Sequence, residues 1–142
     1  MTIRRASWWG TALFTATSAG AAAAPETALQ GVAFVVAVGL FLAGCGIFAA
    51  AYNQAVRRSR QSVIGVTQLF FLTGDSAPAD VRRSLLGAFG LQVAVALGAA
   101  IARPYSSLAA GTLTPLYGLA LCGLWAARHG AFPRREPGDR GD

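Results

Sequence analysis

Residues 31–51 read GVAFVVAVGLFLAGCGIFAAA and carry no charged or strongly polar side chain. At about 1.5 Å per residue, a helix of this length spans the roughly 30 Å hydrocarbon core of a bilayer. A helix on the surface of a small soluble domain keeps a polar face toward water, whereas this segment would be apolar on every face. The stretch therefore predicts a transmembrane helix, with a buried core helix as the alternative interpretation.

The composition of the whole chain agrees with a membrane protein. Its 142 residues are 54% hydrophobic and 13% charged, whereas soluble domains contain roughly 25% charged residues. The net charge is +6. Its arginines border apolar runs, which is typical of membrane proteins rather than of a basic face for nucleic acid. We therefore expect one integral membrane domain and no nucleic-acid partner.

Apolar runs and helix-ending residues divide the chain into four expected transmembrane helices. Their approximate ranges are 7–24, 25–52, 78–102 and 107–127. Pro115 falls inside the last of these ranges and predicts a kink. The intervening residues 53–77 are expected to form a cytoplasmic loop or an interfacial helix. Within them, Gln61 to Thr73 are interpreted as a helix, with a strand as the alternative because β-branched residues are frequent there.

The N-terminal segment has two interpretations. The basic start MTIRR, the apolar run and the alanine cluster together have the outline of a secretory signal peptide. However, Pro25 directly after the cluster makes a poor cleavage position, and a complete span begins within a few residues. We expect the segment to be retained as a first transmembrane helix, whereas cleavage would leave three. Residues 1–130 then form a single all-α membrane bundle, and 131–142 form a disordered cytoplasmic tail.

The distribution of arginine predicts the orientation. With four helices, every arginine except Arg103 falls on the side of the membrane that holds both termini. Because Lys and Arg accumulate on the cytoplasmic side of membrane proteins, we expect both termini to be cytoplasmic. This pattern predicts a multi-pass protein of the plasma membrane.

The expected spans lack the groups that usually carry chemistry inside a membrane. Transporters and proton relays place Asp, Glu, His or Lys there. In this chain the six acidic residues and the single histidine, His129, fall in expected loops, tails or helix ends. Cys45 and Cys122 show no CxxC or metal-ligand spacing, which favours a packing role for both. We expect neither an enzyme nor a bound metal or cofactor.

Arg57, Arg58 and Arg60 directly follow the second expected helix. They are candidates for binding anionic lipid headgroups. The alternative is that they act only as a topology signal.

Small residues recur at every fourth position of the third expected helix. Such spacing lets two helices approach closely in a membrane. The candidates for helix packing are Gly90, Ala94, Gly98 and Ala102. Gln92, near the middle of the same helix, is expected to make an interhelical hydrogen bond, with a contact to a cofactor or quinone as the alternative.

Two stretches carry a resemblance to known proteins: FFLTGDSAPADVRRSLLGAFGLQ, beginning at Phe70, and ARPYSSLAAGTLTPLYGLALCGLWAARHGAFPRR, beginning at Ala102. They resemble small multi-pass membrane proteins of actinobacteria. Some proteins of that kind accompany the cytochrome bcc–aa3 respiratory supercomplex, which the resemblance implies as a candidate partner. The resemblance carries no catalytic motif, so it assigns no functional residues.

A chain with little mass outside the membrane and no reactive group suits an accessory role. We expect a non-catalytic accessory or assembly subunit of a larger plasma-membrane complex, with other membrane subunits and anionic lipids as partners. The alternative is a small membrane protein of envelope biogenesis or lipid handling.

Overall fold

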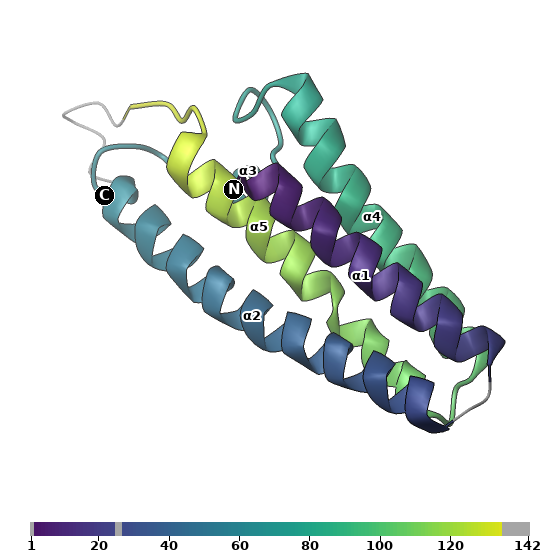
Figure 1. Cartoon of the computed structure of the whole chain (residues 1–142). Helices are drawn as coiled ribbons and strands as arrows, with labels where there is room; N and C mark the ends of the chain where they lie inside the picture. Colours follow the sequence, from purple (N-terminus) through teal and green to yellow (C-terminus); the bar gives the residue numbers. More distant parts are fainter. Residues whose placement is uncertain (1, 25–26, 135–142) are drawn as a thin grey trace.

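The computed structural model describes residues 2–24 and 27–134, which are mostly helical. The elements are α1 (Ile3–Ala23), α2 (Thr27–Ser59), α3 (Val66–Phe70), α4 (Ala79–Ala102), the 3-10 helix η1 (Ser107–Leu113) and α5 (Pro115–His129). The four long helices lie side by side, with α5 between α2 and the pair formed by α1 and α4 (Figure 1). The expected all-helical bundle is confirmed.

Three helical segments of the described chain are long and apolar enough to cross a membrane. They are Ala28–Ser59, Ala79–Ala102 and Ala109–His129. Of the three, the last is the most buried inside the bundle, because η1 and α5 contact every other long helix. A multi-pass helical membrane protein is therefore well supported by length and composition.

Helix α2 extends beyond its predicted end at residue 52 and continues through Arg57 and Arg58 to Ser59. Cations in the last turn interact favourably with the negative end of the helix dipole, so the basic run extends the helix. The predicted start of this helix at Pro25 and Glu26 lies outside the described residues.

The last predicted helix does not continue through Pro115 as a single α-helix but changes helix type there. Pro115 is the first residue of α5, where its missing N–H costs no hydrogen bond. The preceding residues form the separate 3-10 helix η1, and Thr114 N donates to the carbonyl oxygen of Gly111 at 3.0 Å. The last span is thus a tight 3-10 segment followed by an α-helix.

The segment between α2 and α4 is more irregular than predicted. Its helix covers only Val66–Phe70, instead of Gln61 to Thr73. Ser62 forms an isolated antiparallel bridge with Arg134, and Val63 N donates to the carbonyl oxygen of Pro133 at 2.9 Å. The first residues of the tail therefore pair with this loop, whereas residues 135–142 of the predicted disordered tail lie outside the described chain.

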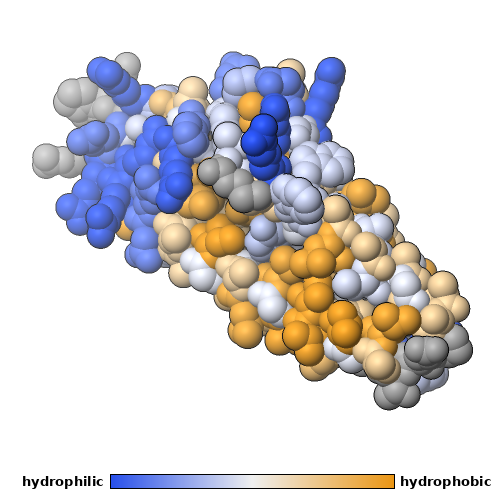
Figure 2. All heavy atoms as spheres, in the orientation of Figure 1, coloured by the Kyte–Doolittle hydropathy of each residue, from blue (hydrophilic) through white to orange (hydrophobic). Residues whose placement is uncertain are grey.

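The surface of the bundle is divided into two zones. Hydrophilic residues gather at one end, at the upper left of Figure 2, and apolar residues cover most of the remaining visible face. The N-terminus of α1 and the end of α5 both lie at the hydrophilic end (Figure 1). Arg103, by contrast, follows the opposite end of α4, where its Nη2 lies 3.4 Å from the carbonyl oxygen of Ala22.

Candidate functional site

A fully buried amide joins three helices at the centre of the bundle. Gln92 of α4 is 0% exposed. Its Nε2 donates to Thr11 Oγ1 of α1 at 2.8 Å, and its Oε1 accepts from the backbone N of Gly118 in α5 at 3.2 Å. Thr11 in turn donates to the carbonyl oxygen of Ser7 at 2.8 Å. The structure places Gln92 in an interhelical hydrogen-bond network, and its burial leaves no surface for a quinone.

Glycines decide how closely α5 approaches its neighbours. A Cβ at Gly118 would lie 2.6 Å from Gln92 Oε1, so a larger residue there would displace the amide oxygen from its hydrogen bond with the Gly118 backbone N. A Cβ at Gly44 of α2 would lie 2.9 Å from the backbone of Tyr117. The Tyr117 hydroxyl donates to the carbonyl oxygen of Ala6 at 3.0 Å and so reaches α1. These contacts make a closely packed centre where α1, α2, α4 and α5 meet.

The predicted packing stripe of α4 faces away from the rest of the chain. Its four members, Gly90, Ala94, Gly98 and Ala102, are all exposed. A Cβ added at Gly90 or Gly98 would meet no atom within 4 Å. The face of α4 that packs inside the bundle instead carries Leu85, Ala88, Gln92, Ala96 and Ala99. The stripe is not an intrachain contact, and a contact with a partner stays a prediction.

The predicted arginine cluster is divided between two environments. Arg58 turns toward the end of α5, where its Nη1 donates to the carbonyl oxygen of Ala127 at 2.8 Å and its Nη2 to that of Gly130 at 3.1 Å. Its guanidinium also lies 5.4 Å from the ring centroid of Phe132. Arg57 and Arg60 are exposed. Within this cluster, Arg57 and Arg60 remain candidates for binding lipid headgroups, because the Arg58 side chain is engaged within the chain.

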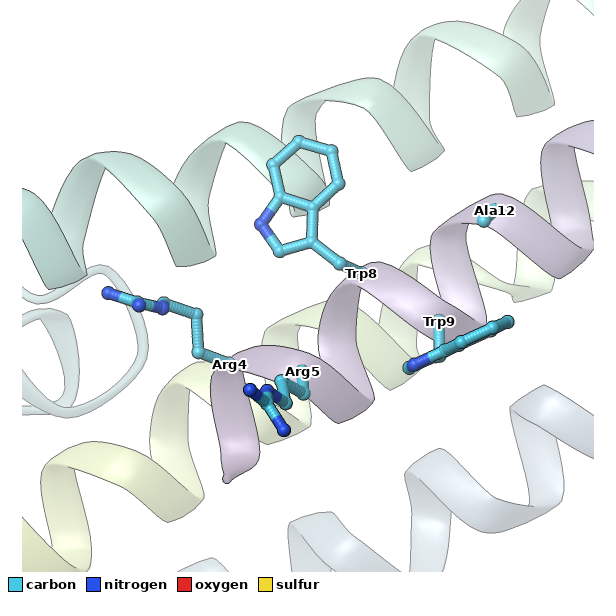
Figure 3. Close-up of a pocket in the computed structure, with 5 residues that line it drawn as sticks. All are labelled: Arg4, Arg5, Trp8, Trp9 and Ala12. Atoms are coloured by element: carbon cyan, nitrogen blue, oxygen red, sulfur yellow. The ribbon is translucent and has the colours of Figure 1, made fainter. Parts of the chain in front are cut away.

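A second basic site lies on α1 and was not singled out from the sequence. Arg4, Arg5, Trp8, Trp9 and Ala12 line a surface hollow of about 480 Å³. Arg4 and Trp8 project toward one side of α1, beside α4, whereas Arg5 and Trp9 project toward the other (Figure 3). The signal that could have found it is the spacing of two arginines and two tryptophans four residues apart, which places each pair on one helix face.

An apolar hollow of about 270 Å³ lies where α2 meets α3. Its lining includes Phe48, Tyr52, Ile64, Leu69 and Phe70. The rings of Phe48 and Phe70 stack with their centroids 4.7 Å apart. This hollow could accept an apolar chain but offers no group for chemistry.

The described residues offer no metal centre, because no three His, Cys, Asp or Glu side chains among them lie close enough to share an ion. Comparison with protein-family models, curated proteins and solved structures found no match to the chain. The function must therefore be argued from the bundle itself.

Proposed function

We propose that this chain is a four-span plasma-membrane protein that acts as a non-catalytic accessory or assembly subunit of a larger membrane complex. The observation that supports this proposal best is the outward stripe of α4, which is the exposed row of small residues Gly90, Ala94, Gly98 and Ala102. Lipid tails are as apolar as leucine, so helices associate in a bilayer largely through close packing of small residues and hydrogen bonds. The chain leaves this regular run of small residues on α4 unused in its own fold.

The proposal includes α1 as the fourth span. Its polar residues Ser7, Thr11 and Ser18 are buried against the other helices, whereas its exposed residues include Trp9 and Leu13. The polar content that lowers its hydropathy is thus turned away from lipid. Its 21 residues correspond to about 30 Å of helix.

Co-purification tests the accessory role. The tagged chain is extracted from its native membrane in a mild detergent and analysed by size-exclusion chromatography and mass spectrometry. We expect a stoichiometric complex with other membrane subunits. The respiratory supercomplex suggested by the sequence resemblance is the first candidate partner. A chain that elutes alone, with no membrane subunit in constant ratio, would contradict the proposal.

A lipid-handling role is the second candidate. The apolar hollow between α2 and α3 favours it, because this hollow lies at the arginine-rich end where an acyl chain could enter. Purification of the chain without protein partners but with tightly bound lipid would support this role instead.

A further inference from the structure

We propose that the hollow on α1 binds one anionic phospholipid of the leaflet at the arginine-rich end of the bundle. Arg4 and Arg5 would contact the phosphate, and the acyl chain would follow Ala12 between the two tryptophans. This inference concerns a site separate from Arg57 and Arg60 and does not depend on the accessory role.

The charge of the hollow is complementary to a phosphate. Within the described chain, Arg5 makes no hydrogen bond or ion pair, and Arg4 has one loose ion pair, with Nη1 3.8 Å from Asp80 Oδ2. Both arginines lie in the first turn of α1, which contains no acidic residue. Cations at the N-terminus of a helix interact unfavourably with its dipole, and a bound anion offsets this interaction. A guanidinium can also bind a phosphate through two parallel hydrogen bonds.

The lower part of the hollow suits the glycerol and acyl region of a lipid. Tryptophan prefers the membrane interface, because its ring is largely apolar and its N–H is polar. Trp8 is held in place, with Nε1 donating to Ser84 Oγ of α4 at 3.0 Å. Trp9 is 68% exposed and has no hydrogen bond within the described chain, so its indole N–H is available to a lipid.

The geometry orders these groups along the direction in which a lipid would lie. Arg4 and Arg5 come first, Trp8 and Trp9 one turn farther along α1, and Ala12 a further turn along the same exposed surface (Figure 3). One helical turn advances about 5.4 Å, so the polar and apolar parts of a phospholipid meet matching groups in sequence. The two tryptophans leave an open floor at Ala12, since alanine adds no bulk beyond its methyl group.

Quenching of tryptophan fluorescence by brominated lipids tests the proposal. The chain carrying Trp125→Phe, so that emission comes from Trp8 and Trp9, is reconstituted into phosphatidylcholine bilayers. Phosphatidylglycerol or phosphatidylcholine with brominated acyl chains is then added, and relative binding constants are obtained from the quenching. We expect a clear preference for phosphatidylglycerol. Arg4→Gln together with Arg5→Gln should reduce that preference by about fivefold for each arginine.

Two further variants separate a shaped site from general surface charge. Ala12→Phe keeps both arginines but fills the floor of the hollow, and it should also abolish most of the preference. Arg83→Gln with Arg134→Gln removes the same charge elsewhere at the same end, and it should leave the preference unchanged. Apart from Trp125, which is partly buried and is replaced in all the proteins compared, the substituted positions are exposed, and circular dichroism verifies that each variant keeps its helical content.

The outcomes that overturn the proposal are distinct. If phosphatidylglycerol and phosphatidylcholine bind with equal constants to the protein whose hollow is unchanged, the hollow is not a site for an anionic phospholipid. An equal loss in the Arg83 and Arg134 variant would reduce the effect to bulk electrostatics. Displacement of brominated phosphatidylglycerol by soluble glycerol phosphate would assign the arginines to a soluble anion instead of a lipid.

Discussion

Arg58 Nη1 lies 2.8 Å from the carbonyl oxygen of Ala127, and this hydrogen bond ties the end of α2 to the end of α5. The last four carbonyl groups of a helix have no partner within the helix and carry the negative end of its dipole. Arg58 therefore supplies both a donor and a positive charge where α5 ends. The basic run, interpreted from the sequence as a lipid-headgroup site or a topology signal, thus contains one residue that joins α2 to the end of α5.

We expect Arg58→Gln to lower the free energy of unfolding by about 2 kcal/mol, because it removes charge-assisted hydrogen bonds to Ala127 and Gly130 and the contact with Phe132. Thermal or denaturant unfolding in detergent measures the loss. Arg57→Gln removes the same charge from an exposed neighbour and is the matched control, with an expected change within about 0.5 kcal/mol. Equal effects of the two substitutions would refute the specific role of Arg58.

Gly44 and Gly46 provide a matched pair on α2. A Cβ at Gly44 would lie 2.9 Å from the backbone of Tyr117, whereas one at Gly46 would meet no atom within 4 Å. Gly44→Leu should therefore force α2 and α5 apart and lower stability by roughly 1–3 kcal/mol. Gly46→Leu should leave both stability and folded yield close to those of the unsubstituted protein. If the two variants unfold at the same temperature, the close contact of α2 with α5 is wrong.

Gln92 and Thr11 should be energetically coupled. In a double-mutant cycle with Gln92→Met and Thr11→Val, we expect a coupling energy of about 0.6 kcal/mol, which is the average for interhelical hydrogen bonds in a membrane protein. Their 2.8 Å contact joins α4 to α1 and is fully buried. Unfolding free energies of the four proteins in the same detergent provide the measurement. Coupling indistinguishable from zero would mean that the hydrogen bond does not stabilise the fold.

The positions of the long helices could be predicted from the sequence, because apolar runs long enough to cross a membrane are visible without knowing the packing. Residues 31–51 lie entirely within α2, and the break at Arg103 ends α4 as expected. The change of helix type at Pro115 could not be predicted, because a proline is compatible both with a kink inside a helix and with its first turn. Only the structure distinguishes these two positions.

The packing faces were harder to predict for a physical reason. A helix that is apolar on all sides gives no periodic contrast between buried and exposed residues. Gly90 and Gln92 were both candidates, yet two positions correspond to roughly 200° around a helix, so they lie on nearly opposite faces. The burial of Gln92 identifies the inner face, which a polar side chain in the middle of a span must occupy to find a hydrogen-bond partner. The side chain of Arg58 binds the carbonyl oxygens of Ala127 and Gly130, which lie about seventy residues farther along the chain and leave no local signal in the sequence.

The proposed four-span topology predicts where each loop lies. Reporter fusions at residues 54 and 142 should both report the cytoplasm, and a fusion at residue 105 should report the opposite side. The reason is that all arginines except Arg103 belong to the side that holds both termini. A noncytoplasmic signal at residue 142 would overturn the orientation.

Intact mass of the purified protein should also include the residues before Pro25, since a start between Ala22 and Glu26 would remove α1.

The outward stripe of α4 gives the sharpest test of the accessory role. Gly98→Leu adds a large side chain at a position where a Cβ meets no atom of the chain, so folded yield and unfolding temperature should not change. If a partner helix packs closely on this face, the same leucine should separate the two helices and weaken the complex by roughly 1–3 kcal/mol. The measurement is the fraction of protein retained in its native complex after mild detergent extraction.

Leu97→Ile is the control for this stripe, because Leu97 is also exposed but lies one position away from Gly98 and keeps its volume. It should leave retention in the complex unchanged. The combination of normal folding and lost retention for Gly98→Leu alone would place a partner on the stripe, since no contact within the chain can account for it. Unchanged retention would mean that this face meets only lipid. The proposal of an accessory subunit would then lose its main physical support.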